Sequence, residues 1–88
     1  MNDPGNAPAE ITMRQLVDYI ARALVDFPEQ VEVVAMESDN SIIIELKVAP
    51  EDVGKVIGKG GQTAKSMRKI LSAAATKLRK KSLLQIIE

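Results

Sequence analysis

The spacing of apolar residues in the first third of the chain predicts one amphipathic helix. Thr12 and Gln15 have the spacing of a capping box, in which the two side chains cap the first helical turn reciprocally. The apolar residues that then recur at steps of three and four are Met13, Leu16, Val17, Ile20 and Leu24. We expect the helix to end at Phe27, because the residue before a proline disfavours the helical conformation.

A β-hairpin is predicted after this helix, and one more strand at the end of the chain. Residues 31–37 and 41–49 are rich in β-branched side chains, and the residues between them are typical of turns. Four apolar residues of the second segment alternate with more polar ones and are expected to face the core: Ile42, Ile44, Leu46 and Val48. Residues 82–88 alternate in the same way, which predicts a third strand.

Two helices joined by glycines are predicted between the second and third strands. Pro50 suits the first turn of a short helix, which is expected to end near Ile57. The longer helix that follows has apolar residues at helical spacing: Ala64, Met67, Ile70, Leu71, Ala74 and Leu78. The predicted order is therefore α-β-β-α-α-β, an α+β fold with helices packed on one face of a three-stranded sheet.

Composition argues against most catalytic functions. The 88 residues include no Cys and no His, which removes the usual thiolate and imidazole nucleophiles, ordinary zinc ligands and disulfides. We therefore expect no enzyme activity, no cofactor and no metal site. One Tyr and one Phe are too few for an aromatic stacking platform. No segment has the roughly 18 apolar residues of a membrane span, and the first residues lack a signal-peptide pattern, so a cytoplasmic protein is expected.

The net charge of zero conceals two parts of opposite sign. Residues 1–50 hold nine acidic and three basic residues, a net of −6, and residues 51–81 hold two acidic and nine basic residues, a net of +7. A polyanion is therefore expected to bind the second part only. The bases between Lys77 and Lys81 have two interpretations, a solvated helix end that complements the helix dipole or a nucleic-acid contact. Residues 1–10 are expected to be a disordered tail, and residues 11–88 one domain.

A glycine cluster, Gly58-Lys59-Gly60-Gly61, lies between the two predicted helices. Glycine permits positive φ and the close approach of another backbone, so a phosphodiester chain can lie against this segment. The first amides of the following helix, from Gly61 to Thr63 with Gln62 between them, are expected to be unpaired and to point at the same place. The cations within about two turns are Lys55, Lys65, Arg68 and Lys69. The spacing fits neither a Walker loop nor a dinucleotide-binding fingerprint.

The segment Val56-Ile57-Gly58-Lys59-Gly60-Gly61 resembles the V-I-G-x-x-G signature of KH domains. The element order is similar to the type II KH arrangement, and the stretch PEDVGKVIGKGG resembles the small bacterial KH proteins of the KhpA family. The resemblance implies non-catalytic binding of single-stranded RNA, with the loop clamping about four nucleotides and the bases in an apolar groove. It places Val53, Ile57 and Ala64 on the helix side of this groove. Ala64 stands where many KH domains have isoleucine, so the groove is expected to be shallow.

Protein partners are expected as well. The resemblance implies a second, larger KH-containing partner and a role as a post-transcriptional regulator or RNA chaperone. Strand alternation independently leaves apolar side chains on the open face of the sheet, namely Val34, Met36, Ile43, Leu83 and Ile87. Such a face predicts a homodimer or a heterodimer with a related KH protein. The alternative function is a protein-interaction module with weak or indirect RNA binding.

Overall fold

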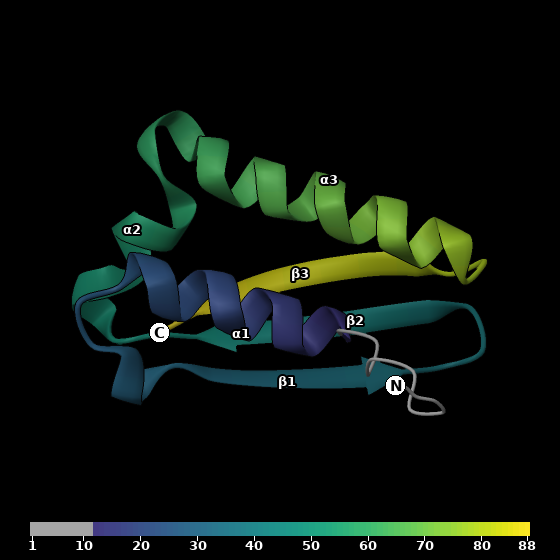
Figure 1. Ribbon diagram of the computed structural model, residues 1–88, viewed down its shortest axis with the longest axis horizontal. Helices are drawn as coiled ribbons and strands as arrows, with labels where there is room; N and C mark the ends of the chain where they lie inside the picture. Colours follow the sequence, from purple (N-terminus) through teal and green to yellow (C-terminus); the bar gives the residue numbers. More distant parts are fainter. Residues whose placement is uncertain (1–11) are drawn as a thin grey trace, which may run out of the picture.

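The order of helices and strands is the predicted one (Figure 1). The computed structural model describes residues 12–88, so the predicted tail and Ile11 lie outside the described residues. The elements are α1 (Met13–Leu24), β1 (Glu32–Glu37), β2 (Ser41–Lys47), α2 (Val53–Ile57), α3 (Gln62–Lys77) and β3 (Lys81–Ile87). Short 3-10 turns, η1 (Pro28–Gln30), η2 (Pro50–Asp52) and η3 (Lys59–Gly61), precede β1, α2 and α3. The α-β-β-α-α-β order and the α+β class are confirmed.

The three strands form one mixed sheet in the order β1-β2-β3. β1 and β2 are antiparallel, with Val33 opposite Leu46, as expected for a hairpin. β3 is parallel to β2, with Leu84 opposite Ile44, and forms an edge of the sheet. A tight turn cannot connect two parallel neighbouring strands. α2 and α3 therefore carry the chain from the end of β2 back to the edge of the sheet where β2 begins, and β3 starts there.

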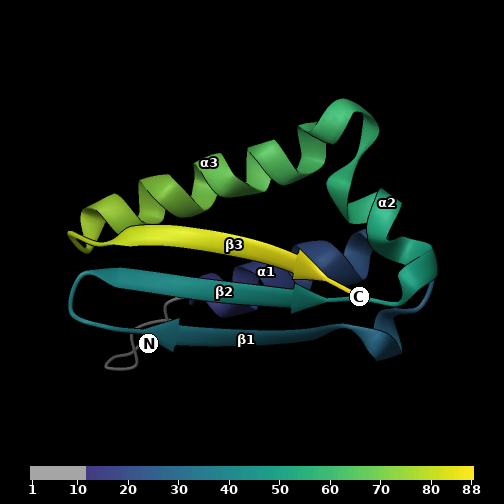
Figure 2. The same cartoon turned by 180° about the vertical axis from the view of Figure 1, so that it is seen from behind.

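The core lies between one face of the sheet and the helices. The largest fully buried apolar side chains are Val17, Ile44, Leu46, Val48, Val56 and Leu71. All four residues that strand alternation places inward in β2 and just after it are buried. Removing this apolar surface from water is the main favourable term in folding. Within residues 12–88, no helix covers the opposite face of the sheet. Figure 2 shows the molecule from the side of this uncovered face.

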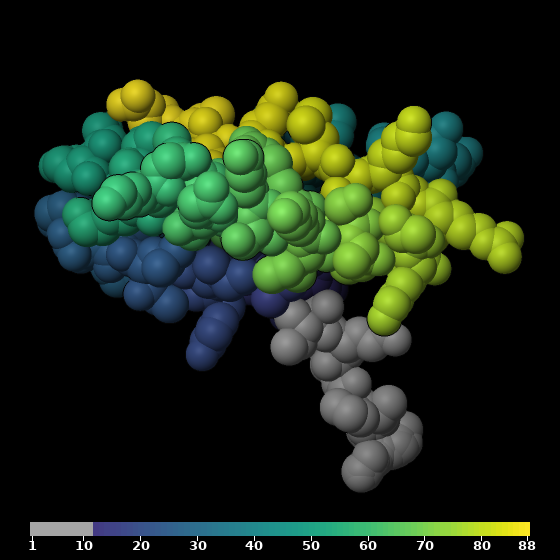
Figure 3. All heavy atoms as spheres, turned by 90° about the horizontal axis from the view of Figure 1, so that it is seen from above, coloured from purple at the N-terminus to yellow at the C-terminus, as the bar shows by residue number. Residues whose placement is uncertain are grey.

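α3 is the longest helix and forms the upper layer of the molecule (Figure 3). Its 16 residues span roughly 24 Å. The side chains that it buries are Ala64, Met67, Leu71 and Ala75. No helix within residues 12–88 combines the length and apolar character that a membrane span requires.

Three apolar residues that were predicted to lie in the core are exposed instead. Leu24 is 39% exposed, Ile70 49% and Leu78 57%. Leu24 and Leu78 stand at the ends of α1 and α3, beyond the buried cluster, and Ile70 borders a pocket between the two helices. Ala21 and Ala75 are fully buried in their place, because small side chains let each helix approach its neighbours closely.

Asp52 is the only charged residue among residues 12–88 that is fully buried. Its Oδ1 accepts a hydrogen bond from the backbone N–H of Asp26 at 3.1 Å, and its Oδ2 accepts one from the N–H of Phe27 at 3.0 Å. These two N–H groups therefore do not continue the helix, and α1 ends at Leu24 rather than at Phe27. The carboxylate thus fixes the start of α2 against the segment that joins α1 to β1.

We expect Asp52→Ala to lower the free energy of unfolding by about 3 kcal/mol, because it leaves two buried N–H donors without an acceptor. Asp52→Asn keeps one acceptor oxygen and should cost about 1–2 kcal/mol. Urea unfolding measures both effects. Glu51→Gln, at the exposed neighbouring position, is the control and should change stability by less than about 0.5 kcal/mol. An Asp52→Ala variant as stable as this control would contradict the assignment.

Candidate nucleic-acid interface

Three glycines with positive φ carry the chain from α2 into α3. Gly58 has φ 81° and ψ 169°, Gly60 has φ 61° and ψ 19°, and Gly61 has φ 76° and ψ 11°. Side chains on L-residues disfavour this half of conformational space, most strongly at the extended ψ of Gly58. The backbone conformation alone therefore requires glycine at Gly58 and favours it at Gly60 and Gly61.

Gly58 differs from the two later glycines in its surroundings. A Cβ at Gly58 would lie 2.2 Å from Oγ1 and 2.9 Å from the backbone nitrogen of Thr63, which is closer than van der Waals contact allows. A Cβ at Gly60 or Gly61 would meet nothing within 4 Å. Gly58 therefore packs against the first turn of α3, whereas Gly60 and Gly61 present an open backbone that another chain can approach.

Two of the amides that the sequence predicts to be unpaired donate hydrogen bonds to carbonyls within the loop. The N–H of Gly61 donates to the carbonyl of Gly58 at 3.0 Å, and the N–H of Gln62 donates to the carbonyl of Lys59. The expectation of free amides at these two residues was therefore wrong, because the 3-10 turn η3 supplies their acceptors. What α3 offers an anion at this end is the positive end of its dipole and the nearby lysines.

The predicted cations around the glycine loop have different surroundings. Lys59 and Lys65 are exposed, and neither forms an ion pair with any other residue in the range 12–88. The Arg68 guanidinium crosses from α3 to β3, where Nη2 donates to the carbonyl of Leu84 at 3.3 Å. Lys59 and Lys65 therefore present their charge to solvent beside the loop, and Arg68 links the helix to the edge strand.

Lys55 forms ion pairs with the carboxylates that hold α2 against the segment after α1. Its Nζ lies 3.2 Å from Oδ2 of Asp26 and 3.7 Å from Oδ1 of Asp52. The hydrogen bond and charge of Asp26, with a smaller contribution from Asp52, raise the pKa of Lys55 above its ordinary value. Two carboxylates offset much of its charge, so Lys55 holds α2 in place more than it extends the basic surface around the loop.

The residues predicted to line an apolar groove are exposed to different degrees. Ile57 is 38% exposed next to the loop, Val53 is half-buried against the core cluster, and Ala64 is only 3% exposed. Ile57 is therefore the main apolar surface that these three residues offer. The sequence left the strand side unassigned, and the contact between Arg68 and Leu84 identifies β3 as the strand that faces α3.

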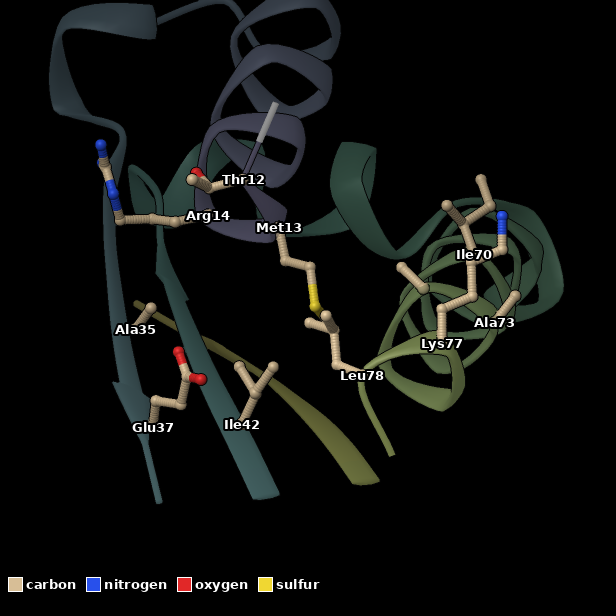
Figure 4. Close-up of a pocket in the computed structure, with 11 residues that line it drawn as sticks. Thr12, Met13, Arg14, Ala35, Glu37, Ile42, Ile70, Ala73, Lys77 and Leu78 are labelled. Carbon is tan, nitrogen blue, oxygen red and sulfur yellow. The ribbon is translucent and has the colours of Figure 1, made fainter. Parts of the chain in front are cut away.

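A pocket of about 900 Å³ lies at the opposite end of α3 from the glycine loop. The start of α1, the C-terminal half of α3, and β1 and β2 line it. Figure 4 shows the side chains of Met13 and Leu78 pointing toward one another between the two helices. None of the predicted site residues lines this pocket, so it is not the groove that the family resemblance implies.

Comparison with known proteins shows which family the chain resembles. The family model of the KhpA/KhpB KH domain matches residues 14–86. The RNA-binding protein KhpA of Clostridium acetobutylicum is 52% identical over 75 residues, which cover 85% of this chain and 100% of that protein. The protein of the same name from Caldanaerobacter subterraneus subsp. tengcongensis is 55% identical with the same coverage. The one from Treponema pallidum is 47% identical over 79 residues, 89% of this chain and 99% of the relative. No solved structure matches the chain significantly.

Substitution of glycine by alanine should lower stability at Gly58 and raise it at Gly54. We expect Gly58→Ala to lower the free energy of unfolding by roughly 2 kcal/mol or more, since it combines a strained backbone with a clash at Thr63. Gly54→Ala, in α2 with open space around it, should raise stability by about 0.5–1 kcal/mol. Urea unfolding of the two variants tests the pair, and a Gly58→Ala variant as stable as Gly54→Ala would refute the packing argument.

Proposed function

The chain belongs to the KhpA/KhpB KH-domain family, and from this premise we propose that it binds single-stranded RNA without catalysis. The relatives compared above are named RNA-binding proteins. The observation that carries the proposal is the open, positive-φ backbone of Gly60 and Gly61 beside the exposed Lys59. KH domains clamp the backbone of about four nucleotides with a loop of this kind.

In the proposed complex, the phosphates lie against the glycine loop and the first turn of α3. Lys59 and Lys65 supply positive charge, and the dipole of α3 adds to it. The remaining proposed contacts are Gly58, Gly60, Gly61, Gln62, Thr63 and Arg68. Lys55 takes part by keeping α2 in position through Asp26 and Asp52.

Base recognition is proposed to be weak. Ile57 and Val53 offer limited apolar surface, and the nearly complete burial of Ala64 leaves little depth for a base beside α3. Affinity then depends mainly on phosphate contacts, which carry no sequence information. A binder that tolerates many sequences suits a cytoplasmic post-transcriptional regulator or RNA chaperone, and we propose this role.

Reversing the charge of the clamp should prevent RNA binding. Lys59→Asp with Gly60→Asp places two carboxylates where the phosphates are expected, so affinity for a mixed-sequence RNA at low salt should fall by at least about ten-fold. Fluorescence anisotropy measures the affinity, and thermal unfolding confirms that the variant is folded.

The matched control is Lys59→Gln with Gly60→Asn. Asn and Asp both tolerate the left-handed conformation that Gly60 adopts, so the two double variants impose the same backbone demand and differ in charge. The control should bind only a few-fold more weakly than the parent chain. Equal affinity of the two double variants would contradict the clamp.

The open face of the sheet favours a second role, in protein interaction. Met36, Ile43 and Leu83 stand in register across β1, β2 and β3, and Val34 and Ile87 are exposed on the same face of the sheet. An apolar row across a sheet that no helix covers within residues 12–88 is a typical protein interface (Figure 2). We propose that this face pairs with a second copy of the chain or with a related KH-domain protein.

Charges on the open face should dissociate the homodimer. We expect light scattering at tens of micromolar to give a dimer mass for the parent chain and a monomer mass for Ile43→Lys with Leu83→Lys. The control is Ala23→Lys with Ser66→Lys, which adds the same charge at exposed helix positions and should remain dimeric. A monomeric parent, or a dimer that survives the first pair of substitutions, would contradict this interface.

A further inference from the structure

Two basic side chains, Lys77 and Arg79, stand at the end of α3 that lies away from the glycine loop; together they are called the distal pair. Both are exposed, and neither forms an ion pair with any other residue between 12 and 88. Their neighbour Lys80 is different, because it pairs with Glu37. Lys81 begins β3 on the side of the open sheet face and is not part of the pair.

Arg79 is held in an unusual backbone conformation. The N–H of Lys80 donates to the carbonyl of Ala75 and the N–H of Arg79 donates to the carbonyl of Thr76, both at 2.9 Å, which is the Schellman pattern that ends many helices. Arg79 occupies the left-handed position of this motif with φ 59°, where glycine is usual. Among residues 12–88 it is the only residue other than glycine with positive φ. Strain of this kind often marks a functional position.

The surface between the loop and the distal pair carries no negative charge from its own segment. Residues 53–87 contain no Asp or Glu. Lys65, Lys69, Ser72 and Thr76 share one exposed side of α3, and Lys77 follows at the next position, where it also borders the pocket between α1 and α3. Figure 3 shows α3 exposed along its length between these two ends. A polyanion held at the loop therefore meets lysines and no acidic side chain along the helix.

We propose that the distal pair is a second phosphate-binding site for the RNA strand that the glycine loop holds. The inference rests on the proposed function of the loop and extends it from a clamp of about four nucleotides to a longer footprint. The two sites are roughly 24 Å apart along α3. A stacked strand advances roughly 3.4 Å per nucleotide, so a tetranucleotide cannot span this distance and a dodecamer can.

The test compares a tetranucleotide and a dodecamer of RNA on two double variants. Lys77→Gln with Arg79→Gly removes the distal pair, and Lys47→Gln with Ala23→Glu changes the net charge by the same amount at exposed positions of β2 and α1 that do not line the pocket beside the distal pair. We expect the first variant to bind the dodecamer roughly five- to ten-fold more weakly, with a salt slope smaller by about 1.4, while its tetranucleotide affinity stays within about two-fold. The control variant should bind both RNAs like the parent chain.

Substitution of Arg79 also separates weaker RNA binding from loss of folding, because the two should accompany opposite changes in the melting temperature. Arg79→Gly relieves the left-handed strain, so it should raise the melting temperature by roughly 4 °C while weakening dodecamer binding. Arg79→Lys keeps the charge and should retain dodecamer affinity. Equal dodecamer affinity of the parent and the Lys77→Gln, Arg79→Gly variant, with tetranucleotide binding intact, would overturn the second site and leave the loop's function standing. A parent chain that binds neither RNA would overturn both.

Discussion

The absence of a side chain at Gly58 is the constraint on which the candidate site depends. Thr63 occupies the space that a Cβ would need, so the end of α2 and the first turn of α3 are packed directly against one another. This contact sets how α3 leaves the loop, and the buried side chains Met67 and Leu71 then hold α3 on the core. At the other side of the turn, the buried carboxylate of Asp52 fixes α2 to the segment after α1.

The loop is consequently firm at its base and open at its tip. Gly60 and Gly61 also have positive φ, but a Cβ at either would meet nothing within 4 Å, so another chain can approach their backbone. The lysines at the base and at the tip also differ. Lys55 pairs with carboxylates at the base, whereas Lys59 is exposed at the tip. A firm base with an open, basic tip suits a polyanionic chain that is recognised by its backbone more than by its bases.

Much of the fold could be predicted from local patterns. The capping box at Thr12 is present, strand alternation correctly assigned Ile44 and Leu46 to the core, and the glycine cluster separates two helices as expected. The end of α1 could not be predicted, because it depends on hydrogen bonds to Asp52, a residue 25 positions beyond Phe27 in the sequence. The exposure of Ile70 and Leu78 was missed for a related reason, since helical periodicity shows which residues share a face but not where a neighbouring helix stops covering it.

An NMR titration of the amide signals with a short single-stranded RNA shows whether RNA meets the chain at the tip of the glycine loop. We expect the largest chemical-shift changes on Lys59, Gly60 and Gly61, continuing into the first turn of α3. The amides of β1, on the other side of the sheet from this loop, should stay nearly unchanged. If the largest changes fell on β1, or around the pocket between α1 and the end of α3, RNA binding at the glycine loop would be refuted.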